Sequence, residues 1–235
     1  MMETVIQWDK QLLLLLNGSD SWLLDSLMMT LTNALIWIPF YLALVYMVVR
    51  ANRHLKGVLC VIGCVALCLL FAGAFDDLVV KPLVARLRPT HDPEIGGLVR
   101  TVDNYRETLY GFFSAHAANT FSVALFLSLL VRRRMLTITL IAWSLLNAWT
   151  RIYLGVHYPG DVLAGLLWGA MVGYAVYRFS LRLLVPADDS LLVRADDSLS
   201  MPADYSVSFC RIPVLIFLLT TIGTLLSVII FKSLI

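Results

Sequence analysis

Charged side chains are scarce in this chain of 235 residues, where Asp, Glu, Lys and Arg together account for only 14%. Hydrophobic residues make up 60%, and the mean hydropathy is +0.82. A soluble globular protein of this length does not normally show that balance. The composition therefore excludes an ordinary soluble domain and predicts a polytopic membrane protein.

The sequence also lacks the repeated ten-residue alternation that is typical of a membrane β-barrel. A helical bundle is then the remaining fold that satisfies every backbone polar group inside a bilayer. Six windows approach the roughly 20 mainly apolar residues of a spanning helix, and we expect the short third and fourth to continue into flanking residues. They are Leu27–Val49, Gly57–Phe75, Ala117–Val131, Met135–Trp149, Val162–Phe179 and Val214–Phe231. The predicted fold class is all-α, a transmembrane helical bundle of about six spans plus an N-terminal interfacial helix.

Cysteine is rare, with four residues in the chain. Cys60, Cys64 and Cys68 recur every four residues on one stripe of the second predicted span, where we interpret them as small packing residues. Cys210 stands alone, and no His or carboxylate accompanies the other three in their apolar setting. Neither a disulfide framework nor a metal site is predicted.

The first 26 residues lack both a basic leader and an uninterrupted apolar run. We interpret residues 1–26 as an interfacial helix and a turn, and not as a span or a cleavable signal. The predicted division continues with a membrane-embedded core over 27–182, a polar linker over 183–212 and a C-terminal transmembrane helix over 213–235. The linker contains three imperfect Ala-Asp-Asp/Tyr-Ser repeats. Its polarity and its Pro residues favour a plain cytoplasmic linker over a partner-docking segment.

Lys and Arg residues gather in the loops after the first, third and fifth predicted spans. These loops fall on one side of the bilayer, which the positive-inside rule assigns to the cytoplasm. The basic residues are Arg50, Arg53, Lys56, Arg132, Arg133, Arg134, Arg178 and Arg182. We therefore expect a multi-pass protein of the inner (cytoplasmic) membrane. Its Val80–Phe113 loop and Thr150–Asp161 connection would then face the periplasm or exterior.

Three clusters of polar residues lie on that outer side, and the first reads KPLVARLRP. Lys81 supplies a point charge, and Arg88 supplies a planar fork that can bind two phosphate oxygens at once. Pro89 would stop a helix and fix the direction of the chain beside Arg88. The cluster predicts phosphate binding, although a basic run of this kind carries little weight by itself.

The second cluster reads FFSAHAANTF and contains Ser114 and His116. If a helix begins near Ser114, its free N–H groups point at the site and favour an anion. The Ser114 hydroxyl can donate one further hydrogen bond, and His116 is placed to donate or accept a proton. The cluster therefore adds proton transfer to the predicted chemistry.

The third cluster reads TRIYLGVHYPGD and contains Arg151, His157 and Asp161. Its Pro-Gly pair predicts the start of a helix, which places Asp161 in the first turn. From there the carboxylate can bond one ring nitrogen of His157 and fix its tautomer, leaving the other lone pair as a nucleophile. An Asp in a first helical turn also interacts favourably with the helix dipole, which is the structural alternative.

Taken in order, Lys-x6-Arg-Pro, Ser-x-His and Arg-x5-His-x3-Asp resemble the three motifs of the type 2 phosphatidic acid phosphatase and vanadium haloperoxidase superfamily. The resemblance covers Lys81 to Asp161 directly and about Leu27 to Phe179 by layout. The family's second motif usually reads Pro-Ser-Gly-His, whereas Phe113 and Ala115 stand at the Pro and Gly positions here. The extra methyl of Ala115 bears on substrate range and fine geometry more than on reaction type.

The resemblance implies phosphate hydrolysis that needs neither metal nor cofactor. His157 would attack phosphorus to give a phosphohistidine, Asp161 would orient His157, and His116 would protonate the leaving oxygen before helping water to attack. The residues implied to hold the phosphoryl oxygens are Lys81, Arg88, Ser114, Ala115 and Arg151. Headgroup selection is expected in the loop His91–Tyr110.

The expected substrate is a lipid phosphate, because the site lies at a membrane interface with apolar walls. Bacterial members of the resembled family act on undecaprenyl diphosphate, phosphatidylglycerol phosphate or lipid A phosphates, and the sequence leaves the choice open. A phosphotransferase using the same phosphohistidine remains an alternative, as does a transporter or other non-catalytic membrane protein. The haloperoxidases of the superfamily are soluble, which disfavours that activity. We expect no nucleic-acid partner, and the oligomeric state stays open.

Overall fold

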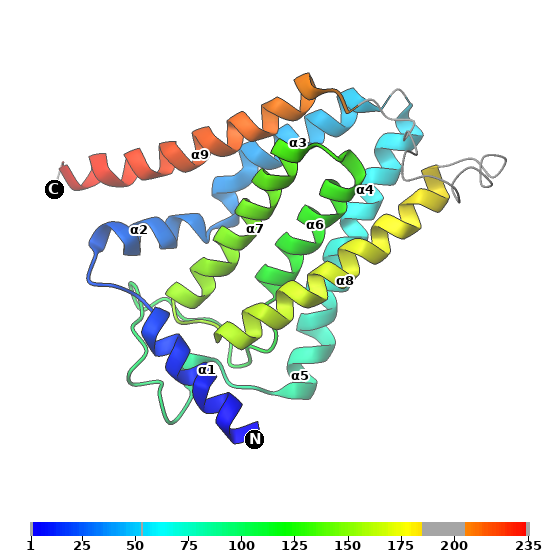
Figure 1. Cartoon of the computed structure of the whole chain (residues 1–235). Coiled ribbons are helices and arrows are strands. Elements are labelled where there is room, and N and C mark those ends of the chain that lie inside the picture. The colour runs from blue at the N-terminus through cyan, green and yellow to red at the C-terminus, as the bar shows by residue number, and fades with distance from the viewer. Residues whose placement is uncertain (1, 53, 185–204, 234–235) are drawn as a thin grey trace.

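The computed structural model of this chain describes residues 2–52, 54–184 and 205–233. Within these ranges the regular structure is helical, apart from one isolated β-bridge between Leu87 and Tyr110. The central bundle consists of α3 (Ile38–Ala51), α4 (Leu55–Leu69), α6 (Ala115–Val131), α7 (Arg134–Tyr153) and α8 (Pro159–Leu184). Figure 1 shows these helices with α9 (Val207–Ser233), which packs against α3 and α7. The all-α transmembrane fold is thereby confirmed.

Four helical segments are long and apolar enough to cross a membrane: Ala34–Ala51, Leu55–Val84, Pro159–Leu183 and Val207–Phe231. The second is α4 prolonged by π-helical turns at Leu70–Ala74 and Asp76–Val80 and by the short α5 (Lys81–Val84). Helix α6 is apolar but has 17 residues, and α7 has 20. The number of six spans therefore remains a prediction.

The first span begins later than the expected Leu27, because α2 (Trp22–Leu31) ends before it. Asn33 then caps a short 3-10 turn, Ala34–Trp37, by accepting a hydrogen bond from the amide of Leu35 at 3.0 Å. An Asn at this position competes for backbone hydrogen bonds and so separates two helices that hydropathy alone would join.

Apolar side chains cover the outside of the bundle as well as its interior. Leu42, Leu59 and Leu167 are 63%, 59% and 60% exposed, as is expected of residues that face lipid. Inside, the rings of Trp37, Phe40, Trp143 and Phe217 pack with centroids 5.6 to 6.4 Å apart. The bundle thus has an apolar core and an apolar belt.

Helices α6 and α8 approach each other closely along a row of glycines. A Cβ added at Gly165, Gly169 or Gly173 would lie 2.5 Å from the carbonyl oxygen of Ser114, Ala118 or Ser122, respectively. Small residues permit such backbone contact between membrane helices. At the end of this seam the amide of Ser114 donates to the carbonyl of Asp161 at 3.1 Å. The packing therefore fixes the N-terminal ends of both helices against each other.

Helix α1 (Met2–Leu16) lies at the same end of the bundle as the long loop that follows α5 (Figure 1). The predicted linker falls largely on residues 185–204, outside the described ranges. Helix α9 begins at Val207, inside the range predicted as linker.

Candidate active site

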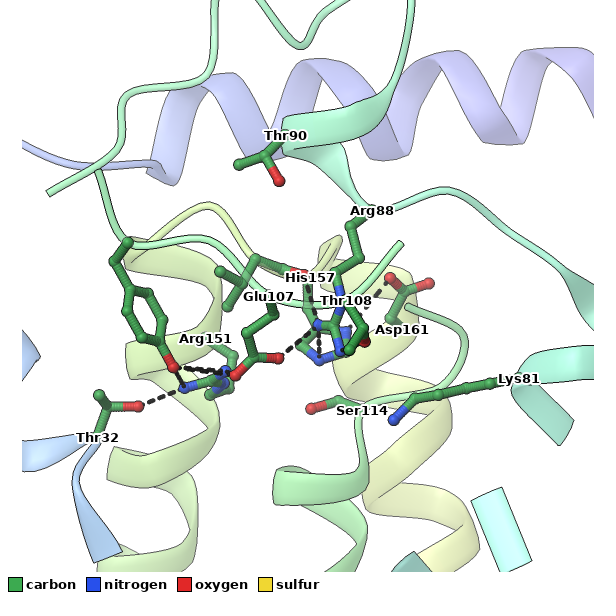
Figure 2. A network of polar contacts seen from close by, with 12 residues as sticks. Thr32, Lys81, Arg88, Thr90, Glu107, Thr108, Ser114, Arg151, His157 and Asp161 are labelled. Atoms are coloured by element: carbon green, nitrogen blue, oxygen red, sulfur yellow. Dashed lines mark hydrogen bonds and ion pairs between the residues drawn. The ribbon is translucent and has the colours of Figure 1, made fainter. Parts of the chain in front are cut away.

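The described residues of the three sequence clusters meet at one end of the bundle. Arg88 lies in the loop after α5, Arg151 in the last turn of α7, and His157 in the connection to α8. Asp161 lies in the first turn of α8, as predicted. These four side chains are almost fully buried, with exposures of 3%, 0%, 1% and 0%. Figure 2 shows them converging from segments far apart in the chain.

The nucleophile candidate His157 lies between a cation and an anion. Its Nε2 is 2.7 Å from Nη1 of Arg88, and its Nδ1 is 3.6 Å from Oδ2 of Asp161. A guanidinium can only donate, so Nε2 accepts and carries the lone pair, which leaves the ring proton of the neutral imidazole on Nδ1. This is the tautomer that nucleophilic attack through Nε2 requires.

The hydrogen bond expected between Asp161 and His157 is not formed, because 3.6 Å exceeds the usual range for such a bond. Other donors hold the carboxylate. Nη1 of Arg86 lies 2.5 Å from Oδ1 of Asp161, and the amide of Tyr158 donates to Oδ2 at 3.1 Å. Asp161 therefore faces Nδ1 at ion-pair distance while its position is set mainly by Arg86 and the local backbone.

The second cluster lies where α6 begins. Ser114 is the N-cap of α6, and its hydroxyl accepts a hydrogen bond from the amide of Ala117 at 3.4 Å. Ser114 and Ala115 are buried, and His116 is partly buried. His116 contributes to the wall of a cavity inside the bundle. The helix start near Ser114 is as predicted.

Lys81 is the predicted residue least engaged with the others. Its ammonium group pairs with Asp76 Oδ2 at 3.1 Å and also with Asp77, one turn earlier in the same helix. Figure 2 nevertheless shows the end of this side chain directed toward Ser114. Lys81 can thus reach the site from the side of α5.

Glu107 is the functional candidate that sequence reasoning missed. Its Oε2 lies 2.9 Å from Nη1 of Arg88, and its Oε1 pairs with Nη2 of Arg151. Burial would raise the pKa of Glu107, but Arg151 and Arg88 outweigh that effect and hold the pKa at about 2. The sequence did offer one signal for Glu107, because it is a carboxylate among the basic residues of the loop His91–Tyr110, where headgroup selection was expected.

The surroundings of His157 disfavour its charged form. Burial lowers the pKa of His157 well below 6.5, and the nearby guanidinium groups of Arg88 and Arg151 lower it further. The imidazole is therefore neutral at physiological pH, as a nucleophile must be.

Several buried nitrogen atoms in this cluster have no hydrogen-bond partner among the described residues. Within the described part of the chain, Arg88 Nε, Arg151 Nε and His157 Nδ1 are buried without a hydrogen-bond partner. Buried polar groups are normally satisfied, and exceptions are typical of binding or catalytic sites. No three His, Cys, Asp or Glu residues among those searched, which are the described ones, gather in a way that could hold a metal ion.

A cavity of about 490 Å³ lies beside His116. Its walls come from α3, α4, α6 and α7, and most of the lining side chains are apolar, including Val45, Ile62 and Leu69. These three residues are 46%, 44% and 45% exposed on the bundle surface, so the cavity reaches the lipid-facing side. The site thus joins a polar end rich in cations to an apolar chamber.

Comparison with known proteins matches the region of the chain that contains the three clusters. Residues 57–184 match the family model described as the PAP2 superfamily, a range that contains all three clusters. The chain is 40% identical to the lipid A 4'-phosphatase of Bacteroides thetaiotaomicron over 185 residues, which is 78% of this chain and 81% of that protein. It is 33% identical to the lipid A 4'-phosphatase of Porphyromonas gingivalis over 180 residues, covering 77% of this chain and 76% of the relative.

A solved structure has a similar fold. The transmembrane PAP2-type phosphatidylglycerolphosphate phosphatase of Bacillus subtilis superposes with a TM-score of 0.56 over 76% of this chain and 87% of that one. The sequence identity is 21%, so this likeness concerns the fold.

Proposed function

This chain belongs to the PAP2 superfamily and is a membrane lipid phosphatase, and we propose that its substrate is a phosphate ester on the sugar headgroup of lipid A. The observation that carries the chemistry is the convergence of Arg88, Arg151, His157 and Asp161 in one buried cluster. The lipid A assignment is supported by the two relatives of that activity, which match more than three quarters of this chain.

The proposed reaction begins with attack of His157 Nε2 on phosphorus. The new N–P bond forms as the P–O bond to the sugar breaks, and His116 gives its proton to the leaving oxygen. Asp161 faces the Nδ1 proton and stabilises the positive ring. In the second half, His116 takes a proton from water, whose oxygen attacks phosphorus and releases inorganic phosphate and His157.

The phosphoryl group gains negative charge on its outer oxygens during both steps. Arg88 and Arg151, which are bridged by Glu107, supply N–H donors beside His157, and Lys81 adds a charge from α5. Ser114 and the amide of Ala115 lie at the positive end of α6, which favours an anion. The charges come from the chain's own cations, so the proposed mechanism requires no metal.

The apolar cavity beside His116 suits one hydrocarbon chain of such a substrate. A chain of this kind could enter from lipid where Val45 and Ile62 reach the bundle surface, while the phosphate meets the cations at the end of the bundle. Binding of both ends would hold the ester bond next to His157.

The proposed location is the inner membrane with the active site on the outer face. One short connection, which contains Asn52, joins α3 to α4, and another, which contains Arg132, joins α6 to α7. Both connections lie at the opposite end of the bundle from the α7–α8 connection that carries His157. Basic residues at these connections favour the cytoplasm for that end. The site would then face the periplasm.

The test uses purified protein in detergent with EDTA and lipid A that bears both phosphates. We expect release of inorganic phosphate from the 4' position, and loss of that release in His157→Ala. Full activity of His157→Ala, or a requirement for added metal, would contradict the mechanism. Phosphate release equal to substrate consumed supports hydrolysis, whereas a phosphorylated acceptor in place of phosphate would indicate the phosphotransferase.

A further inference from the structure

Glu107 occupies the space between the two guanidinium groups proposed to bind phosphate. One carboxylate oxygen lies 2.9 Å from Arg88, and the other pairs with Arg151. The side chain of Glu107 is 20% exposed, while those of Arg88 and Arg151 are 3% and 0% exposed. The carboxylate therefore lies between the two cations, as Figure 2 shows, and is the more exposed partner in both ion pairs.

A carboxylate bound in this way resembles a bound phosphoryl group. Each presents two oxygens to two forked cations, and such charge-assisted pairs are among the stronger polar interactions in proteins. Arg88 also donates toward Nε2 of His157 at 2.7 Å, so the nucleophilic lone pair is covered in the same arrangement. A phosphate that takes the place of Glu107 must also draw Arg88 away from His157.

We propose that Glu107 is a specificity-determining residue, which fills the phosphate position until a terminal phosphate with more than one negative charge displaces it. This inference rests on the proposed function, because it concerns the same site. It adds a property that the reaction itself does not require, namely rejection of the phosphodiester groups that surround the enzyme in a membrane.

The charge of a phosphate group determines whether it can displace the Glu107 carboxylate from Arg88 and Arg151. A phosphate monoester carries about −1.5 to −2 charges near pH 7 and three free oxygens. A phosphodiester headgroup carries one charge and two free oxygens, which is no more than the Glu107 carboxylate offers. Glu107 is also tethered, which gives it a high effective concentration at the two cations. A diester therefore gains nothing by displacing it, whereas a monoester does.

The segment that carries Glu107 is suited to movement. Residues 104–108 have no helical or strand structure, and Arg106 and Thr108 on either side of Glu107 are exposed. The hydroxyl of Tyr105 donates to Glu107 Oε1 at 2.9 Å and accepts from Arg151 at 3.4 Å, so this segment is held partly by one of the cations that Glu107 covers. Outward displacement of this short segment uncovers Arg88 and Arg151 without separating any helices.

The experiment compares wild type with Glu107→Gln, Glu107→Asp and the control Asp103→Asn. Asp103 lies in the same loop and is exposed, so its substitution makes the same change in net charge away from Arg88 and Arg151. The probes are inorganic phosphate and dimethyl phosphate, used as inhibitors of lipid A hydrolysis and as additives in thermal unfolding.

We expect Glu107→Gln to bind inorganic phosphate about tenfold or more tightly than wild type, because one charge-assisted competitor is lost. Dimethyl phosphate should inhibit Glu107→Gln while leaving wild type and Asp103→Asn unaffected at the same concentration. Glu107→Asp is one methylene too short to span both cations and should lie between the two. Phosphate should raise the unfolding temperature of Glu107→Gln more than that of wild type.

Weaker or unchanged phosphate binding in Glu107→Gln would overturn the inference, because Glu107 would then assist the cations instead of competing for them. If Glu107→Gln does not fold, the phosphate affinity of Glu107→Asp relative to wild type tests the inference instead. Thermal unfolding with phosphate needs no turnover, so it tests the competition even if lipid A proves not to be hydrolysed. Failure of the proposed function would appear separately, as absence of phosphate release by wild type.

Discussion

Arg86 Nη1 lies 2.5 Å from Asp161 Oδ1, which makes Arg86 the strongest partner of the carboxylate that faces His157. The other terminal nitrogen of Arg86 lies 2.7 Å from Asp9 on α1, and Asp9 also accepts from the amide of Gly160 at 2.7 Å. The N-terminal helix is thus connected to the candidate catalytic cluster through two ion pairs. Arg86 is a positioning residue by this geometry, since it holds Asp161 without touching Nε2 of His157.

Replacement of Arg86 by Met should lower kcat by roughly 10- to 100-fold, because Asp161 loses the donor that fixes its orientation. KM should change by less than about threefold, since Arg86 contacts Asp161 and not the phosphate position. Arg86→Lys keeps the charge and should recover part of the rate. Steady-state kinetics on lipid A in detergent provide the measurement.

Arg100→Met is the matched control for Arg86, because Arg100 forms ion pairs with Asp20 and Asp25 at the same end of the bundle. Neither partner touches His157 or Asp161, so kcat should stay within about twofold of wild type. An equal loss in both variants would mean that Arg86 acts through general stability alone.

Gly111 lies directly against the candidate catalytic cluster, and even a methyl group at this position should disturb the cluster. A Cβ at this position would lie 2.9 Å from Arg88 Cγ and 3.6 Å from His157 Nδ1. Arg88 Cγ is close to the backbone and cannot swing away cheaply, so Gly111→Ala should misplace the guanidinium. We expect kcat/KM to fall by about tenfold or more. Gly97→Ala, where a Cβ meets nothing within 4 Å, should leave it unchanged.

His157 should make the stability of the protein depend on pH. Burial and the two guanidinium groups lower its pKa in the folded state far below 6.5, so the unfolded chain binds a proton that the folded chain does not. The stability contribution is therefore fully present above about pH 6.5 and is lost as the pH falls, at about 1.4 kcal/mol per pH unit. The measurement is the unfolding temperature at about pH 7.5 and about pH 5. His157→Gln lacks this group, and its unfolding temperature should fall less between those two values; an equal fall would refute the assignment.

The sequence sufficed to place residues whose position depends on local signals. Ser114 before a run of small apolar residues marks the start of α6, and Pro159-Gly160 marks the start of α8, so Asp161 was expected in the first turn. The ordered motifs indicated that these helix ends would share one site. The convergence of Arg88, Arg151 and His157 agrees with that expectation.

Contacts between distant segments could not be predicted in the same way. Arg86 and Asp161 are separated by 75 residues, and Arg86 and Asp9 by 77, so no spacing in the sequence relates them. Glu107 looked like one acid among several in a polar loop, and its role depends on how that loop folds over α7. The prediction of a hydrogen bond between Asp161 and His157 was wrong for a related reason, because Arg86, which lies outside the three motif patterns, competes for the carboxylate.

The seam between α6 and α8 yields a prediction about stability that also reaches the active site. A Cβ at Gly169 would lie 2.5 Å from the carbonyl oxygen of Ala118 and 3.1 Å from its Cα, and both are backbone atoms that cannot yield without moving a helix. Gly169→Ala should therefore destabilise the protein by about 1–3 kcal/mol, as overpacking does.

The same substitution at Gly63 in α4 should change the free energy of unfolding in the opposite direction. In the described part of the chain, a Cβ at Gly63 would meet nothing within 4 Å beyond its chain neighbours and its own helix backbone, so Gly63→Ala adds only helix propensity and should stabilise by up to about 1 kcal/mol. Because the amide of Ser114 bonds to the carbonyl of Asp161 at the end of the same seam, Gly169→Ala should also lower kcat, and Gly63→Ala should not. Thermal unfolding and kinetics on the two variants measure both effects. Equal unfolding temperatures would show that α6 and α8 can separate at no cost, and the seam would then not be what holds Ser114 beside Asp161.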